Sequence, residues 1–267
     1  MKEQLGKEEP RLLLFDLDGT LLRSDKTISK RTLKALCKCR EKGILIGIST
    51  SRAVHNCMTF LPDLTPDLFI ASGGAVVKYR DDYIYAAEFT VEETQSMIRT
   101  AREICGPDCE ITIDTLDAHY WNYKVDPNKA DATWGETVYT DFVDYSERAL
   151  KFCVEIFDHS QAENLAAGLP DCDCLRFSGS AWYKFTKKEA TKENAIQKAC
   201  KACGIALRDV AAFGDDVPDI GMLKLCGTGV AMGNAVNLVK AAADIIIGSN
   251  DEDGIAQYLE NTLCGEI

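Results

Sequence analysis

Two aspartates that are separated by one residue follow an apolar segment near the start of the chain. The segment RLLLF (11–15) predicts a strand buried on both faces, because parallel strands of this kind are continuously apolar. Asp16 and Asp18 come next, and their spacing lets both carboxylates leave the end of the strand on one side. Ligands bind at this edge of open α/β sheets, so the pair marks a candidate site. The structural alternative is an ordinary D-G turn that ends a strand.

Two further side chains are suited to binding a phosphoryl oxygen. Thr50 ends a second apolar segment, GILIGIST (43–50), and its hydroxyl can donate a hydrogen bond. Lys192 lies in the first turn of a helix predicted to begin in TKENAI (191–196), where the helix dipole disfavours a cation. An anion-binding role explains this position. Neither residue is decisive alone, because hydroxyls at strand ends and lysines in first turns are common.

A second pair of acidic residues occurs in FGDDVPDIGML (213–223). Asp215 ends a predicted strand, and Asp219 lies one helical turn further on. Carboxylates in oxygen-rich surroundings suit Mg²⁺, which prefers hard ligands. The alternative is a solvated acidic helix start, which the helix dipole also favours.

These segments lie where predicted strands and helices alternate. Ser29 is suited to cap a helix that runs to about Gly43. Further strands are expected at LFIAS (68–72), VAAFG (210–214), GVAM (229–232) and ADIII (243–247). The pattern indicates an α/β fold with a doubly wound parallel sheet.

The residues between about 79 and 185 have a different pattern. Their predicted strands are longer, more aromatic and more strictly alternating: DDYIYAAEF, EITIDT, HYWNYKV, LKFCVEIF, CLRFS and AWYKF. Two helical stretches interrupt them, and the first has Thr90 and Glu93 at the spacing of a capping box. We therefore expect an inserted α+β module at residues 79–185, within a discontinuous core formed by residues 1–78 and 186–267.

Composition excludes several partners. The chain has 267 residues and a formal net charge of -12, which disfavours nucleic acid and anionic membrane surfaces. No apolar run approaches the roughly 20 residues that span a bilayer. The segment MKEQLGKEEP lacks the apolar stretch of a signal peptide. We expect a cytoplasmic location, and no obligate protein partner is indicated.

The chain contains twelve cysteines. Three close pairs have spacings that are compatible with a zinc or redox site: Cys37/Cys39, Cys172/Cys174 and Cys200/Cys203. Ordinary thiols are favoured, because no histidine lies at ligand spacing and Cys200 and Cys203 fall in a helical pattern. A cytosolic protein also keeps such thiols reduced.

Taken together, the four acidic, hydroxyl and lysine segments resemble those of the haloacid dehalogenase-like (HAD) hydrolase superfamily. The tail segments VAMGNA (230–235), VKAAAD (239–244) and NDEDGIA (250–256) resemble its Cof-type sugar-phosphate phosphatases. The resemblance covers nearly the whole chain. It implies a Rossmann-like core, a cap that selects the substrate, a Mg²⁺ cofactor, and hydrolysis of a small phosphorylated metabolite, expected to be a sugar phosphate, through an aspartyl-phosphate.

The resemblance also implies a role for each acidic residue. Asp16 is expected to be the nucleophile and a metal ligand. Asp18 is expected to protonate the leaving oxygen, to activate water, and to bind the metal through its backbone carbonyl. Asp215 is expected to be the other protein ligand, with Asp219 beside the metal ligands. We expect the negative surroundings to raise the pKa of Asp18, which must be protonated for its first step.

Thr50 and Lys192 are expected to hold the transferring phosphoryl group. Three positions depart from the family pattern: Gly73 and Pro218, where Asn is usual, and Lys184, where Glu is usual. A phosphomutase or phosphotransferase of the same superfamily and a non-catalytic phosphate-sensing regulator are the alternatives. Four aromatic residues of the insertion belong either to its core or to the substrate cleft: Trp121, Tyr123, Trp182 and Tyr183.

Overall fold

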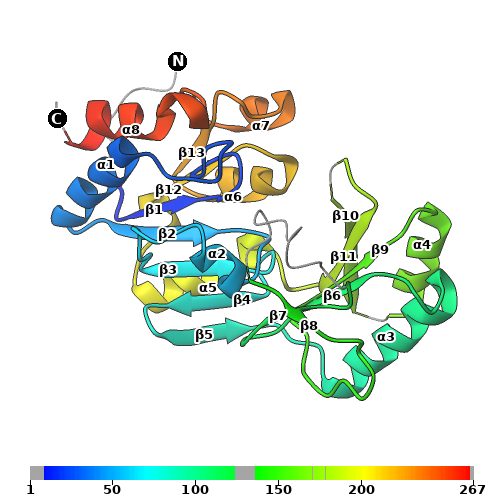
Figure 1. Cartoon of the computed structure of the whole chain (residues 1–267). Helices are drawn as coiled ribbons and strands as arrows, with labels where there is room; N and C mark the ends of the chain where they lie inside the picture. Colours follow the sequence, from blue (N-terminus) through cyan, green and yellow to red (C-terminus); the bar gives the residue numbers. More distant parts are fainter. Residues whose placement is uncertain (1–8, 124–135, 170, 178, 265–267) are drawn as a thin grey trace.

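Two β-sheets organise the chain (Figure 1). The computed structural model describes residues 9–123, 136–169, 171–177 and 179–264. The larger sheet contains β1 (Leu12–Phe15), β2 (Leu45–Ser49), β3 (Leu68–Ala71), β4 (Val76–Tyr79), β5 (Asp82–Ala86), β12 (Val210–Gly214), β13 (Thr228–Ala231) and β14 (Ile245–Ile246). Its order is β14-β13-β12-β1-β2-β3-β4-β5, parallel from β14 to β3 and antiparallel beyond. The predicted parallel sheet is confirmed.

Helices cover both faces of the larger sheet (Figure 1). On one side α1 (Lys30–Glu41) packs against α8 (Gly254–Leu259), and on the other α5 (Lys192–Cys203) packs against α6 (Ile220–Leu225). Ser29 caps α1 as predicted, because its side chain accepts a hydrogen bond from the N–H of Thr32. The shorter elements are α2 (Val54–Met58), α7 (Asn237–Ala242), η2 (Leu207–Asp209), η3 (Val217–Asp219), η4 (Asn250–Glu252) and η5 (Glu260–Cys264). No helix in the described part of the chain is long and apolar enough to cross a bilayer.

The register of the central strands aligns their carboxyl ends. β1 lies between β12 and β2, so that Phe15 is opposite both Phe213 and Ile48. The rings of Phe15 and Phe213 stack with their centroids 4.5 Å apart, and the N–H of Asp16 donates to the carbonyl of Phe213 at 2.9 Å. The chain leaves β1 toward β2 and leaves β12 toward β13, in opposite directions across the sheet. This edge is therefore a topological switch point, where ligands bind in such sheets.

The smaller sheet carries helices on one face. Its strands are β6 (Ile111–Asp114), β7 (His119–Trp121), β8 (Val138–Tyr139), β9 (Lys151–Glu155), β10 (Cys172–Arg176) and β11 (Trp182–Lys187), in the order β10-β11-β9-β6-β7-β8. All neighbours are antiparallel except β7 and β8. Two helices accompany it, α3 (Val91–Cys105) and α4 (His159–Ala167). Thr90 and Glu93 form the predicted capping box of α3. Residues 124–125 and 178 of the expected strands lie outside the described residues.

The two sheets divide the chain at places that differ from residues 79 and 185. β5 was expected in the inserted module but forms the edge of the larger sheet, where it pairs antiparallel with β4. Its alternating sequence reflects an edge strand with exposed side chains rather than membership of the smaller sheet. At the second crossing, β11 stays in the smaller sheet up to Lys187. The assignment of residues 82–86 is corrected, whereas the division into a core and a cap that are separate domains stays a prediction.

Candidate active site

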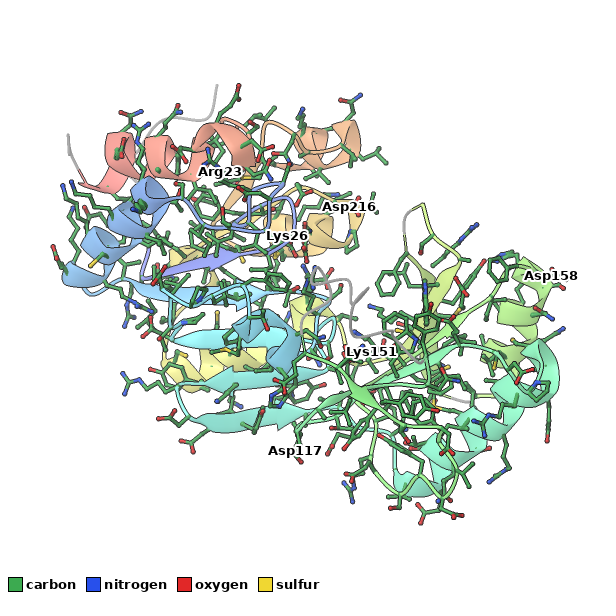
Figure 2. All side chains as sticks on the ribbon, in the orientation of Figure 1. Arg23, Lys26, Asp117, Lys151, Asp158 and Asp216 are labelled. Atoms are coloured by element: carbon green, nitrogen blue, oxygen red, sulfur yellow. The ribbon has the colours of Figure 1, made fainter. Side chains whose placement is uncertain are left out.

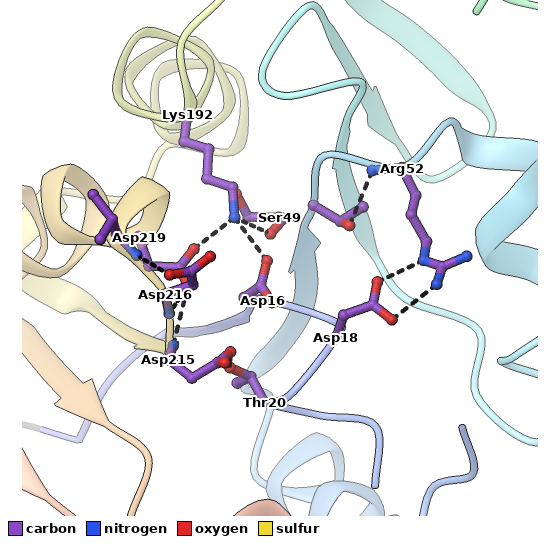
Figure 3. A network of polar contacts seen from close by, with 11 residues as sticks. Asp16, Asp18, Thr20, Ser49, Arg52, Lys192, Asp215, Asp216 and Asp219 are labelled. Carbon is purple, nitrogen blue, oxygen red and sulfur yellow. Dashed lines mark hydrogen bonds and ion pairs between the residues drawn. The ribbon is translucent and has the colours of Figure 1, made fainter. Parts of the chain in front are cut away.

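Asp16 and Lys192 form an ion pair at the carboxyl edge of the larger sheet (Figure 3). Lys192 Nζ lies 2.8 Å from Asp16 Oδ1 and 2.7 Å from Asp219 Oδ1, and it donates to the carbonyl of Ser49 at 2.8 Å. Thr191 caps α5, which fixes the backbone just before the lysine. Burial alone lowers the pKa of Lys192, but the two carboxylates outweigh it and raise that pKa above its ordinary value. The lysine is therefore a fixed positive charge beside Asp16.

Three carboxylates meet around this lysine. Asp16, Asp215 and Asp219 each offer an oxygen, and these oxygens lie within 4.8 Å of one another. Asp219 Oδ2 accepts hydrogen bonds from the backbone N–H groups of Asp215 at 3.0 Å and Asp216 at 3.1 Å. Its Oδ1 is bound by Lys192. Because both of its oxygens are occupied, Asp219 is better suited to support a metal site than to bind the ion.

Asp16 and Asp215 each keep one oxygen available for a cation. Lys192 is bound to Oδ1 of Asp16, and Thr20 donates to Oδ1 of Asp215 at 2.7 Å. Within the described residues, Oδ2 of neither carboxylate accepts a hydrogen bond. Burial and the charge of Asp219 raise the pKa of Asp16, and they raise the pKa of Asp215 to about 6. The site therefore favours a further positive charge, and its hard oxygen donors fit Mg²⁺.

The turn after Asp18 requires a glycine. Gly19 has a φ of +80°, which disfavours other residues. A Cβ at this position would lie 2.4 Å from Oδ2 of Asp215. The glycine thus allows the backbone after β1 to approach the carboxylate that follows β12.

A capped turn orients the second pair of acidic residues. Asp216 caps η3 by accepting the N–H of Val217 at 2.8 Å, and Pro218 lies in the first turn. A proline is well tolerated there, because the first N–H groups of a helix have no partner within the helix. The local structure accounts for Pro218, one of the three departures from the family pattern.

Asp18 is paired with two cations to which the sequence assigned no role. Arg52 donates through Nε to Oδ2 at 2.5 Å and through Nη2 to Oδ1 at 2.9 Å, and Lys26 Nζ lies 2.7 Å from Oδ1. Burial raises the pKa of Asp18, but the hydrogen bonds and charges of these cations outweigh it and lower the pKa. The expected rise of this pKa is therefore wrong for this arrangement. The position of Arg52, two residues after Thr50, was the one signal in the sequence, whereas no pattern marks Lys26.

Thr50 follows β2 directly and is buried. Its hydroxyl accepts a hydrogen bond from the N–H of Arg52 at 3.2 Å. The preceding residue, Ser49, provides the carbonyl that binds Lys192. The structure thus brings the predicted site residues together, at the carboxyl ends of β1, β2 and β12 and at the start of α5.

Comparison with known proteins identifies the family. Residues 13–259 match the model of a family described as haloacid dehalogenase-like hydrolase. The chain belongs to this family. Its relatives include the pyridoxal phosphate phosphatase YbhA of Escherichia coli (strain K12), which is 30% identical over 95% of this chain and 98% of its own. The 5-amino-6-(5-phospho-D-ribitylamino)uracil phosphatase YitU of Bacillus subtilis (strain 168) is 27% identical, covering 94% of this chain and 97% of its own.

The solved structures agree with this membership. The HAD subclass IIB sugar phosphatase BT4131 matches with a TM-score of 0.77 and 26% identity, covering 94% of this chain and 98% of its own. A haloacid dehalogenase-like hydrolase from Bacteroides thetaiotaomicron has a TM-score of 0.82 at 23% identity, over 95% of this chain and 99% of its own, and shows the fold alone. The predicted family, fold class and enzyme class are confirmed: the chain is a HAD-family phosphatase.

Proposed function

We propose that this phosphatase hydrolyses a small phosphorylated metabolite through an aspartyl-phosphate on Asp16, with Mg²⁺ as its metal ion. The contact between Asp16 and Lys192 supports the proposal most strongly, because the carboxylate that we propose as the nucleophile lies beside a fixed cation at the edge of the sheet where ligands bind in such folds. Asp215 and the backbone carbonyl of Asp18 would complete the protein's share of the metal site. When bound, the ion would offset the negative charge of the carboxylates and of the phosphoryl oxygens.

Phosphoryl transfer depends mainly on positioning and charge stabilisation, because the moving group spreads its charge over its oxygens. Lys192 supplies positive charge at Asp16, and we expect the hydroxyl of Thr50 to donate to a phosphoryl oxygen. An oxygen of Asp16 attacks phosphorus while the bond to the leaving oxygen breaks, and Asp18 gives that oxygen its proton. Asp18 then takes a proton from water, which attacks phosphorus and releases Asp16 and inorganic phosphate.

The ion pairs of Asp18 with Arg52 and Lys26 must be broken before Asp18 can act as the proton donor. Asp18 has a lowered pKa while Arg52 and Lys26 are bound to it, so it holds no proton to donate in this arrangement. A phosphate dianion competes strongly for both cations. We propose that the incoming phosphate draws Arg52 and Lys26 away from Asp18, which then becomes able to hold the proton it donates.

The relatives guide the choice of substrate class. Their names refer to pyridoxal phosphate, to 5-amino-6-(5-phospho-D-ribitylamino)uracil and to sugars. We propose a sugar phosphate or a similar small phosphomonoester. A phosphomutase or phosphotransferase is the alternative, and assays with a second sugar acceptor distinguish the two by whether inorganic phosphate or a new phosphate ester is formed. A cytoplasmic location stays a prediction.

The test uses p-nitrophenyl phosphate and the variant Asp16→Asn, with the exposed Asp81→Asn as the matched control. Asp16→Asn is expected to keep its fold and lose turnover, whereas Asp81→Asn keeps the wild-type rate. Intact-mass analysis of acid-quenched wild type is expected to show one added phosphoryl group that is absent from Asp16→Asn. EDTA is expected to stop turnover until Mg²⁺ is restored. Substantial turnover by Asp16→Asn would show that another residue is the nucleophile.

A further inference from the structure

The smaller sheet turns its helix-free face toward the larger sheet (Figure 1). Helices α3 and α4 pack against alternate side chains of its central strands, including Tyr183 and Phe185 of β11. Side chains of a strand alternate between the two faces, so Trp182, Lys184 and Thr186 lie on the opposite face. This second face contacts the loops that follow β2 and β3. It therefore adjoins the site at the carboxyl edge of the larger sheet.

Most of the buried charge on this face is paired. Lys151 Nζ lies 2.6 Å from Oδ2 of Asp114, and His119 Nδ1 lies 2.7 Å from Oδ1. Two contacts reach the larger sheet: Lys151 donates to the carbonyl of Ser51 at 2.8 Å, and Ser72 Oγ donates to Asp114 at 2.8 Å. Figure 2 shows Lys151 where the two parts of the chain meet. This group has its partners within the protein and serves to join the two parts.

Lys184 is different, because it is a buried cation for which no described residue serves as counterion. Its residue is 9% exposed. Within the described ranges, its amino group makes neither a hydrogen bond nor an ion pair. Burial, reinforced by the positive charge of Lys151, lowers the pKa of Lys184 to about 8. Within these ranges the protein therefore supplies no counterion for this ammonium, a state that proteins rarely retain without a role.

The amino group of Lys184 lies beside the loop that connects to the phosphoryl site. A Cβ on Gly73 would come within 2.7 Å of Lys184 Nζ, so the glycine makes room for the lysine head. The N–H of Gly73 donates to the carbonyl of Thr50 at 3.0 Å. The next residue, Gly74, contacts the backbone of Thr191 just before Lys192. The two unexplained departures from the family pattern, Gly73 and Lys184, are therefore one local arrangement next to the site.

We infer that Lys184 binds a second acidic group of the substrate, a carboxylate or a second phosphate on the part of the molecule that is not hydrolysed. The inference rests on the proposed function and names the substrate class for the same site. Among the described residues, three other cations around the site are each paired with a carboxylate: Arg52 with Asp18, Lys151 with Asp114 and Lys192 with Asp16. In the part of the chain that the structure describes, Lys184 is thus the cation without a carboxylate partner, and we expect a ligand to supply its counterion.

The test compares matched substrates in wild type, Lys184→Met, Lys184→Arg and the exposed control Lys188→Met. One arm pairs 3-phosphoglycerate with glycerol 3-phosphate, and the other pairs fructose 1,6-bisphosphate with fructose 6-phosphate. In each pair, the acidic partner carries the second acidic group and the neutral partner lacks it. Lys184→Met is expected to lower the ratio of kcat/KM for the acidic partner to kcat/KM for the neutral partner by about ten-fold or more in at least one arm, as loss of a charged hydrogen bond implies. Lys184→Arg is expected to keep most of the preference, and Lys188→Met all of it. The responding arm identifies the acidic group.

An unchanged ratio in both arms for a folded Lys184→Met would overturn the inference, whether kcat/KM stays at the wild-type value or falls equally for the two substrates of a pair. Failure of the proposed function has a different signature, namely that wild type releases no phosphate from any ester. Calorimetric binding of the same compounds to Asp16→Asn, with and without Lys184→Met, then decides the inference without turnover. A preference for the acidic partner that disappears with Lys184 supports it, and the absence of such a preference refutes it.

Discussion

The ammonium of Lys184 has no ion-pair partner among the described residues, so we predict that its removal stabilises the fold. Lys184→Met keeps a long apolar side chain in the same space beside Gly73 and removes the charge. The pKa of this lysine falls from its ordinary value of 10.5 to about 8. At 1.36 kcal/mol for each pH unit, the buried charge costs about 3 kcal/mol of folding free energy. Lys184→Met is therefore expected to raise the free energy of unfolding by about 2–3 kcal/mol at pH 7.

The dependence on pH follows from the same two pKa values. Below about pH 8 the lysine is protonated in both the folded and the unfolded chain, so the wild type carries the full cost. Between about 8 and 10.5 the unfolded chain binds more protons than the folded one, so the stability of the wild type rises with pH. The advantage of Lys184→Met is therefore expected to shrink across this window.

Urea unfolding at pH 7 and at pH 9.5, without substrate, measures both effects. Lys188→Met is the matched control, because that lysine is largely exposed and pairs with Asp171 at 3.8 Å. Its stability is expected to stay within about 0.5 kcal/mol of the wild type at both pH values. If Lys184→Met is no more stable than the wild type at pH 7, the ammonium is satisfied within the folded protein and the reasoning fails.

Two further predictions concern residues with no direct role in binding the second acidic group. Asp114→Asn is expected to lower the free energy of unfolding by about 3 kcal/mol at pH 7, because it leaves Lys151 buried without its counterion. Since Lys151 and His119 offset the burial of Asp114 and hold its pKa below the ordinary value, the difference from wild type in urea unfolding should shrink as pH falls below about 4. Gly19→Ala is expected to lower kcat with p-nitrophenyl phosphate by about ten-fold or more while costing about 1 kcal/mol in unfolding, because its Cβ collides with Asp215. Wild-type kcat in Gly19→Ala would show that the close approach is dispensable.

The sequence was most informative where a chemical residue follows an apolar strand. Asp16, Thr50 and Asp215 each end a buried segment, and parallel pairing of those segments brings the three together. Such positions can be predicted from the sequence because parallel strands always bring their carboxyl ends to the same edge of the sheet. The edge strand β5 was assigned to the wrong sheet for a related reason. A strand with one exposed face has the same alternation of polar and apolar residues in either sheet. Only its pairing with β4 decides its membership.

The ion-pair partners of Asp18 could not be predicted from the sequence, for another reason. Lys26 reaches Asp18 because the chain folds back in a turn in which the N–H of Arg23 donates to the carbonyl of Thr27. Lys26 itself has a positive φ of 64°, a local backbone state that no composition rule indicates. The pKa of Asp18 depends on these contacts rather than on the other carboxylates of the site. The expectation drawn from the negative surroundings therefore had the wrong sign.

The position of β1 between β2 and β12 also has a consequence for synthesis on the ribosome. Thr20 and its partner Asp215 are 195 residues apart, so one side of the apolar segment LLLF stays without its final neighbour while most of the chain is made. At 5–20 residues per second this interval lasts roughly 10–40 s. During that time an unpaired apolar strand edge is exposed to other nascent chains, which favours aggregation unless a chaperone covers it. Catalytic activity therefore requires that β12 has been synthesised and that β1 has stayed free to pair with it until then.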